Sequence, residues 1–378
     1  MKYRKFGKLD WKVSALGFGA MRLPILNEDH AQIDEAQAIP MIRYAVDHGV
    51  NYIDSAWGYH RGYSEVVVEK ALRDGYREKV KVATKLPCPD VQTAADFDRL
   101  LNEQLGRLDN KIDFYLLHGL NKMRWAKVRD LGVIKWAERQ LAEGRIGHIG
   151  FSFHDNYDVF KEIIDAYDNW TLAQIQYNYM DETNQAGTKG LEYAHKKGLA
   201  VVVMEPIRGG KLSRPPEKVA KMWAEAPVQR TPAEWALRWV WNHPEVSTVL
   251  SGMGSMQQVV ENVASEEHSQ PHNLTADEVA LVRRVKDAYF SNAVACTGCR
   301  YCMPCPNGVE IPRTFNLYND AVIYGDAVRP RRDYGRMTAE QRADNCTKCE
   351  QCVEKCPQQL AIPELLEKAD IFLKDCAE

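Results

Sequence analysis

Short segments rich in β-branched residues alternate with amphipathic segments over the first 290 residues or so, and this alternation limits the fold more than any other feature. Each of eight such segments is followed by helical periodicity; they span residues 14–18, 51–54, 81–85, 113–118, 148–152, 173–177, 200–204 and 247–251. Strands that alternate with helices form parallel sheets. Eight units of this size match a closed (β/α)8 (TIM) barrel, with an open doubly wound sheet as the alternative. Residues 1–10 are expected to form a short hairpin at the floor of the barrel.

The composition changes after about residue 290, which predicts a second domain. Of ten cysteines, nine lie between Cys296 and Cys376, and only Cys88 precedes them. A helix that opens with a Thr275–Glu278 capping box is expected to run to about Tyr289, and residues 361–374 are expected to form a closing helix. We therefore predict a barrel over residues 1–290 and a small, mostly helical domain over residues 291–378.

Eight of these cysteines form two clusters that have the spacing of metal-cluster ligands. The clusters are Cys296, Cys299, Cys302 and Cys305-Pro306, followed by Cys346, Cys349, Cys352 and Cys356-Pro357. Three cysteines at two-residue gaps can bind one face of a cubane, and a fourth cysteine before Pro is typically a ligand of the other cubane. The second motif has the bacterial ferredoxin spacing, whereas the first is one residue shorter. This pattern predicts a ferredoxin-like domain with two [4Fe-4S] clusters; zinc, which also binds four thiolates, is the alternative. Cys88 and Cys376 are expected to be ordinary thiols.

Charge and hydropathy exclude several classes of protein. Lys and Arg number 49 against 52 Asp and Glu, a net charge of −3, which argues against binding to nucleic acid or to a membrane surface. No apolar run approaches the roughly 18 residues that would span a bilayer. The first residues, Met1–Gly7, lack the apolar core of a signal peptide. We therefore expect a cytoplasmic protein with no membrane or nucleic-acid partner.

Four residues that carry chemistry are expected at one face of the barrel. Asp54 and Tyr59 follow one strand, Lys85 ends the next strand, and His118 ends the strand after that. The carboxyl ends of barrel strands converge on the face where catalysis occurs. These four side chains are therefore expected to meet at a reactive centre; a buried Asp–Lys pair with Tyr and His packed nearby is the structural alternative.

These residues resemble the catalytic tetrad of the aldo/keto reductases. The likeness covers about residues 1–290 and includes the D-x4-Y pattern, Thr84-Lys85, the segment 114–118, and the segment 143–152 before the fifth strand. The whole chain is similar to the subgroup that carries a ferredoxin-like domain after the barrel. The resemblance implies that a small-molecule carbonyl and its alcohol are interconverted by hydride transfer with a nicotinamide, NADPH or NADH.

The resemblance also implies a role for each member of the tetrad. Tyr59 would donate a proton to the carbonyl oxygen, and His118 would hydrogen-bond and orient the carbonyl. A free phenol, with a pKa of about 10, is a weak acid at neutral pH. Lys85 would lower the pKa of Tyr59, and Asp54 would hold Lys85 charged and in place.

Nucleotide contacts are also implied by the resemblance. Ser152 and Gln174 match the pair that holds the nicotinamide carboxamide. The remaining positions are Gly19, Met21, Met204, Pro206, Ile207, Gly252, Gly254, Ser255, Gln258, Glu261 and Asn262. In NADPH-preferring relatives, basic residues near the Gly252 and Gln258 positions bind the 2′-phosphate, and neither is basic here, so the choice between NADP and NAD stays open. Arg22 and Arg208 could supply the charge instead.

The two predicted cofactor types differ in how they transfer electrons. A cubane transfers one electron at a time, whereas a nicotinamide transfers a hydride, which carries two. The clusters are therefore either peripheral, or exchange electrons with a redox partner protein, or work through a flavin. Two alternatives to a nicotinamide-dependent oxidoreductase stay open. One is a flavin- or cluster-fed reductase without a bound nicotinamide, and the other is a non-catalytic electron-transfer subunit.

Overall fold

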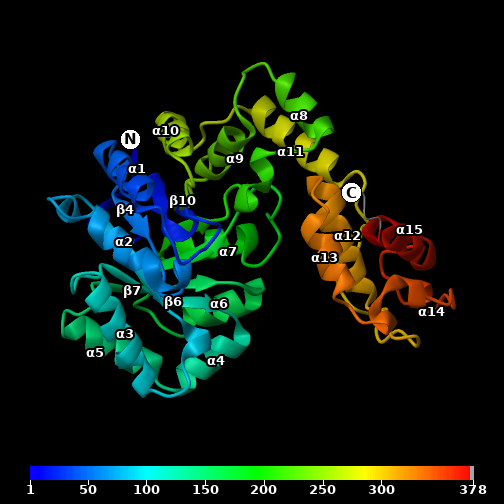
Figure 1. Cartoon of the computed structure of the whole chain (residues 1–378), viewed down its shortest axis with the longest axis horizontal. Coiled ribbons are helices and arrows are strands. Elements are labelled where there is room, and N and C mark those ends of the chain that lie inside the picture. The colour runs from blue at the N-terminus through cyan, green and yellow to red at the C-terminus, as the bar shows by residue number, and fades with distance from the viewer. Residues whose placement is uncertain (375–378) are drawn as a thin grey trace. The chain divides into compact units, whose positions relative to one another are not determined.

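The computed structural model describes residues 1–374, in which eight parallel strands close into a barrel (Figure 1). The order around the barrel is β10-β3-β4-β5-β6-β7-β8-β9, so the sheet is closed, as predicted. The strands are β3 (Leu16–Gly19), β4 (Tyr52–Asp54), β5 (Lys81–Leu86), β6 (Phe114–Leu120), β7 (His148–Phe153), β8 (Leu172–Gln176), β9 (Ala200–Met204) and β10 (Val246–Ser251). Each predicted strand segment is therefore confirmed, with shifts of one or two residues at the ends.

Amphipathic helices surround the barrel because each has one apolar stripe to bury. They are α1 (Glu35–Asp47), α2 (Tyr63–Ala71), α3 (Ala95–Arg107), α4 (Lys122–Asp130), α5 (Val133–Ala142), α6 (Tyr157–Asp165), α7 (Gly187–Lys196), α9 (Pro232–Trp241) and α10 (Met256–Ser265). In α6, Phe160 and Ile163 are fully buried, and the Asn156 side chain caps the helix by accepting from the Val159 amide.

A hairpin closes the amino-terminal end of the barrel, but it is longer than predicted. Strand β1 (Tyr3–Lys5) pairs antiparallel with β2 (Lys12–Ser14), beyond the expected limit at residue 10. The residues between the two strands form the turn. Within it, Gly7 has φ of +55° and lies too close to the Ala200 backbone for any side chain to fit. The Phe6 ring, fully buried, packs on Phe114 at 4.9 Å between centroids and so seals this end.

By internal packing the chain divides into two compact units. The barrel unit consists of residues 1–210 and 233–279, and the second unit consists of residues 211–232 and the chain from residue 280 onward. The second unit contains α8 (Glu217–Ala224), most of α11 (Ala276–Phe290), α12 (Ile311–Tyr324), α13 (Val328–Gly335), α14 (Gln351–Glu354) and α15 (Ile362–Lys374). This division passes through α11, and the domain boundary at residue 290 stays a prediction.

The second unit has a hydrophobic core of its own. Buried residues from α12, α13, α15 and the connecting loops form it: Val294, Val309, Ile311, Phe315, Tyr318, Tyr334, Met337, Ala343, Ile362, Leu366, Ala369 and Leu373. The Tyr334 hydroxyl links two of these segments, because it donates to Asp370 at 2.5 Å and accepts from the Ala343 amide at 2.8 Å. Most of the clustered cysteines pack against this core.

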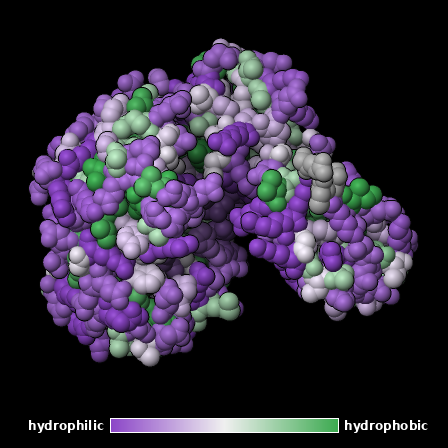
Figure 2. Space-filling model, in the orientation of Figure 1, coloured by the Kyte–Doolittle hydropathy of each residue, from purple (hydrophilic) through white to green (hydrophobic). Residues whose placement is uncertain are grey.

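The surface on the face shown in Figure 2 is dominated by hydrophilic side chains. Within residues 1–374, none of the helices combines the length and apolar character needed to cross a membrane. Cys376, expected to be an ordinary thiol, lies outside the described residues.

Candidate functional site

The structure brings the four predicted catalytic side chains together at the carboxyl ends of β4, β5 and β6. The Lys85 ammonium is fully buried and lies 2.7 Å from Asp54 Oδ1, 2.7 Å from the Ser55 carbonyl and 3.4 Å from the Tyr59 hydroxyl. The His118 ring meets the Tyr59 ring edge-on, with 6.0 Å between centroids. Phenol, ammonium, carboxylate and imidazole therefore form one continuous cluster.

Tyr59 reaches this cluster through a tight loop. It opens the 3-10 helix η2 (Tyr59–Gly62), in which His60 and Arg61 have left-handed backbones with φ of 49° and 54°. The loop is tied to the barrel where the Ser64 hydroxyl meets Ser55 Oγ at 2.9 Å and donates to the Ala20 carbonyl. These contacts fix the position of the phenol.

A buried polar network behind the tetrad was not predicted from the sequence. Glu65, which has no exposed surface, accepts from Thr84 Oγ1, from Gln104 Nε2 at 2.6 Å and from Arg107 Nη1 at 2.9 Å. Gln104 also donates to the Lys85 carbonyl, and Arg107 donates to the Trp57 carbonyl. The network thus holds both the strand that carries Lys85 and the loop that carries Tyr59. The only sign of this network in the sequence is Glu65 itself, an acidic residue directly before the apolar run 66–68.

The ionisation of the pair Lys85–Asp54 favours a charged amine. Burial alone would lower the pKa of Lys85, but the Asp54 carboxylate and the Tyr59 phenol outweigh it, and this pKa is raised. The Asp54 carboxylate, which also interacts with the Gln174 side chain, has a raised pKa because its burial outweighs the effect of the Lys85 ammonium.

The pKa of Tyr59 differs from the expected direction. Burial raises this pKa above its ordinary value, and the nearby Lys85 ammonium opposes the rise without cancelling it. Lys85 lowers this pKa as expected, but the burial of the phenol, which the expectation left out, outweighs it, so the net pKa is raised. Tyr59 therefore holds its proton at neutral pH, which is the state that a proton donor requires.

His118 is neutral under ordinary conditions. Burial and then the positive charges of Lys85, His154 and Arg124 lower its pKa to about 3. Because a lowered pKa favours the uncharged imidazole above that value, His118 can donate one N–H without carrying charge.

This ionisation predicts the shape of a pH profile. Between about pH 5 and pH 8, the kcat/KM for carbonyl reduction should show no limb from His118, because the imidazole stays neutral throughout. His118→Ala should lower the whole profile by about 10²-fold, the usual effect of losing one donor to a developing oxyanion, without changing its shape. A limb near pH 6.5 that disappears in His118→Ala would contradict the prediction.

The predicted carboxamide pair is suited to a nicotinamide. Ser152 and Gln174 are register partners on β7 and β8, and both are almost fully buried. Gln174 Oε1 has no hydrogen-bond partner among the described residues, whereas Gln174 Nε2 lies 3.9 Å from the Met204 sulfur and the Gln174 side chain also interacts with the Asp54 carboxylate. Ser152 Oγ accepts from the Gly119 amide and keeps its own proton to donate. An amide ligand would satisfy these groups.

The residues predicted for the adenosine end cluster after β10. Ser255 caps α10 by accepting from the Gln258 amide, Gln258 Oε1 accepts from the Gly254 amide at 2.8 Å, and Asn262 Nδ2 donates to Ser251 Oγ. These side chains shape the loop itself. Glu261 differs from them, because it is exposed and accepts from Gln257.

Arg22 and Arg208, the two possible sources of charge for a 2′-phosphate, have different surroundings. The exposed Arg22 side chain lies along this loop, and a Cβ placed on Gly252 would be 3.1 Å from its Cδ. Arg208 instead forms an ion pair with the buried Asp181. The other predicted contacts lie at the carboxyl ends of β3 and β9: Gly19, Met21, Met204, Pro206 and Ile207.

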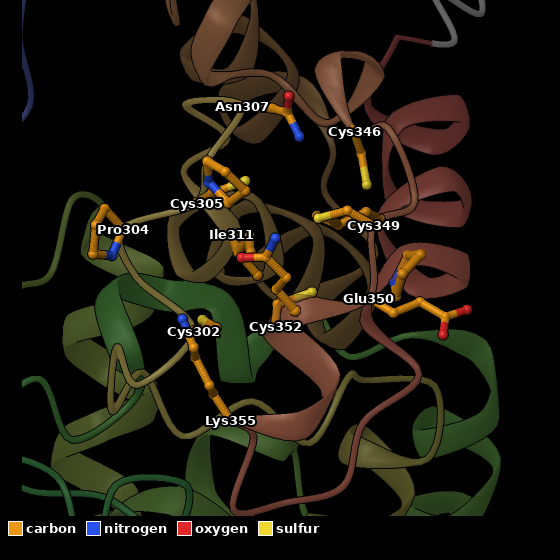
Figure 3. A pocket seen from close by; sticks show the side chains of 14 residues that line it. Cys302, Pro304, Cys305, Asn307, Ile311, Cys346, Cys349, Glu350, Cys352 and Lys355 are labelled. Atoms are coloured by element: carbon orange, nitrogen blue, oxygen red, sulfur yellow. The ribbon is translucent and has the colours of Figure 1, made fainter.

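The eight clustered cysteines line two pockets in the second unit. Figure 3 shows one, a partly open pocket where Cys346, Cys349 and Cys352 face Cys305. The other is lined by four cysteines as well: Cys296, Cys299, Cys302 and Cys356. Each pocket therefore combines three cysteines of one motif with the fourth of the other, and Cys302 also borders the first.

These cysteines have the chemistry of cluster ligands. All nine described cysteines are free rather than disulfide-bonded. Within residues 1–374, no three His, Cys, Asp or Glu side chains are gathered as ligands of a single metal ion. Four thiols around each pocket is the ligand set of a [4Fe-4S] cluster.

Both parts of the chain match families of known proteins. The model of the aldo/keto reductase family matches residues 15–287, and that of the 4Fe-4S dicluster domain matches residues 295–361. The NADH-specific methylglyoxal reductase of Escherichia coli is 25% identical over 76% of this chain and 99% of that protein. A probable aldo-keto reductase of Glycine max is 31% identical over 39% of this chain, but the match spans only 44% of that relative.

A solved structure agrees with the family match. An aldo-keto reductase from Bacillus halodurans in its holo form is 30% identical, with a TM-score of 0.63 over 75% of this chain and 96% of that one. Barrel, tetrad geometry and family match coincide, and the cysteine pockets fall within the second match. The chain belongs to the aldo/keto reductase family of oxidoreductases and carries a 4Fe-4S dicluster domain after its barrel.

Proposed function

We propose that this protein interconverts a small-molecule carbonyl and its alcohol by hydride transfer with a nicotinamide, at a site made of Asp54, Tyr59, Lys85 and His118. The observation that carries the proposal is the position of the Tyr59 hydroxyl, 3.4 Å from the fully buried Lys85 ammonium, which is itself paired with Asp54 at 2.7 Å. The similarity to a methylglyoxal reductase, whose name specifies carbonyl reduction with NADH, supports it.

The residues divide the reaction between them. Ser152 and Gln174 would hold the carboxamide of a bound nicotinamide, which would supply the hydride for the carbonyl carbon. Neutral His118 donates a hydrogen bond to the carbonyl oxygen and orients it. Tyr59 gives its proton to that oxygen, which completes the alcohol, and the Lys85 ammonium stabilises the phenolate that remains. In the oxidative direction the same proton returns to Tyr59.

The dicluster domain supplies one-electron chemistry in this proposal. Each pocket would hold a [4Fe-4S] cluster on four cysteines, three from one motif and one from the other. Cys299 and Cys349 are exposed, so an edge of each cluster would be open to a redox partner protein. Because hydride transfer moves two electrons and each cluster moves one, we propose that the clusters exchange electrons with such a partner and take no part in the hydride step.

The test is an assay of the anaerobically purified holoprotein. 4-Nitrobenzaldehyde is offered with NADH and with NADPH separately, and the alcohol formed is compared with the nucleotide consumed; extracted cofactors are identified in parallel. We expect equal amounts of alcohol and oxidised nucleotide from at least one of the two, and no flavin in the extract. Flavin in the extract together with no use of either nucleotide would favour a flavin-fed reductase. Failure to bind a nucleotide together with tight binding of a redox protein would favour an electron-transfer subunit.

A further inference from the structure

A half-buried arginine lies next to the tetrad without a partner carboxylate. Arg124 is in the first turn of α4, the helix that follows the strand of His118, and the cap residue Asn121 accepts from its amide at 2.8 Å. The helix starts soon after the strand, so the Arg124 side chain can reach back to the end of β6. There its Nη1 donates to the Gly119 carbonyl at 2.7 Å. Gly119 directly follows His118 in the chain.

Glycine at position 119 makes room for this arrangement. Its φ is +62°, and a Cβ there would be 2.9 Å from Arg124 Nη1 and 3.8 Å from the His154 ring. A guanidinium and a second imidazole therefore lie against the backbone beside His118. The charge of Arg124 reaches both imidazoles, since it contributes to the lowered pKa of His118 and of His154.

The charge of Arg124 is not balanced locally. Over residues 1–374, no carboxylate lies within 4 Å of its nitrogens, whereas the positive charge of Lys85 is matched by Asp54. Asp155, in the loop after the next strand, accepts hydrogen bonds from the Lys122 and Asn156 amides instead. A guanidinium offers two parallel N–H groups to a carboxylate or a phosphate, so an unbalanced arginine at this position can bind an anionic group.

The predicted nucleotide phosphates lie elsewhere. Their expected site follows β10, and in the barrel order β10 and β6 are separated by three strands on one side and three on the other. Arg124 follows β6 and so lies across the barrel from that site. It is on the side of the tetrad that holds His118, where the proposed function places the substrate carbonyl.

We propose that the substrate is a carbonyl compound that carries an anionic group, a carboxylate or a phosphate, and that Arg124 binds this group while His118 and Tyr59 engage the carbonyl. The proposal rests on the proposed function and narrows its substrate class. His154 would provide a second donor to the anionic group. Its Nδ1 interacts with Gln185 at 3.2 Å, and its Nε2 has no hydrogen-bond partner among the described residues.

The experiment compares matched charged and neutral substrates in the holoprotein. The pairs are 4-carboxybenzaldehyde with 4-nitrobenzaldehyde, succinic semialdehyde with butanal, and glyceraldehyde 3-phosphate with glyceraldehyde. We expect the wild type to favour at least one charged member by 10-fold or more in kcat/KM, with a KM that rises with ionic strength. Arg124→Gln should reduce that preference by about 10²-fold, mainly through KM, and Arg124→Lys should restore part of it.

The control is Arg129→Gln on the same helix. Arg129 is exposed and paired with Asp130 at 3.0 Å, so its loss should leave the preference unchanged. Comparison of the carboxylate pairs with the phosphate pair tells which anion is preferred. Equal kcat/KM for charged and neutral partners, or an equal loss for both in Arg124→Gln, would overturn the inference. Failure to reduce any of the six aldehydes would instead contradict the proposed function.

Discussion

Tyr59→Phe is expected to lower carbonyl reduction by about 10²- to 10⁴-fold, the usual contribution of a positioned proton donor. The variant removes one hydroxyl, 3.4 Å from the Lys85 ammonium, and keeps the ring that packs edge-on against His118. Because the phenol does not belong to the carboxamide pair of Ser152 and Gln174, nucleotide affinity should stay within about 2-fold of wild type. Steady-state rates with 4-nitrobenzaldehyde and titration of nucleotide fluorescence measure the two quantities separately.

The matched control for this variant is Tyr63→Phe. Tyr63 lies four residues further along the chain, at the start of α2, and is 53% exposed, so losing its hydroxyl should leave the rate unchanged. Wild-type turnover in Tyr59→Phe would rule out the proton-transfer role. A loss of nucleotide binding in parallel with the rate would show that the change disturbs the site rather than the chemistry.

Cys356→Ala is expected to remove the cluster of the first motif, although Cys356 belongs to the second motif in sequence. It lines the pocket of Cys296, Cys299 and Cys302. With three thiolates left, iron should fall from about eight to about four atoms per chain, since each cubane holds four. Iron analysis and electron paramagnetic resonance of the anaerobic, reduced protein measure the loss and identify the cluster.

Double variants test whether each cluster takes three ligands from one motif and the fourth from the other. Cys356→Ala combined with Cys299→Ala should lose no more iron than either single variant, because both residues serve one cluster. Cys356→Ala combined with Cys349→Ala should lose nearly all iron. Cys88→Ala in the barrel serves as the control and should retain it. If Cys356→Ala removed the same resonance signal as Cys349→Ala, the ligands would not be crossed.

The barrel and the meeting of the tetrad could be predicted from the sequence because both depend on local periodicity. Each strand is a short β-branched segment between helical ones, and parallel strands must present their carboxyl ends on one face. Asp54, Lys85 and His118 each lie at the end of a strand or within two residues of it, so their convergence follows from the topology. The hairpin was predicted too short because the pairing of residues 3–5 with residues 12–14 leaves no strong local pattern in the sequence.

Properties that depend on partners distant in sequence could not be predicted in this way. The network of Glu65, Gln104 and Arg107 joins two helices across about 40 residues of chain. The net direction of the Tyr59 pKa depends on burial as well as on a nearby charge, and burial is a property of the fold. The cysteine spacing indicated that a fourth ligand is shared, but only the pockets show which triplet faces Cys305 and which faces Cys356.

The crossed cysteine pockets have a consequence for how this protein matures. Cys302 and Cys356 border the same pocket although more than fifty residues separate them in the chain. During synthesis, therefore, the first triplet emerges from the ribosome well before its fourth thiolate exists, and no complete coordination sphere can form until the second motif has been translated. Because metal binding contributes directly to folding, iron delivery and the final folding of this domain would occur together, after translation of residue 356.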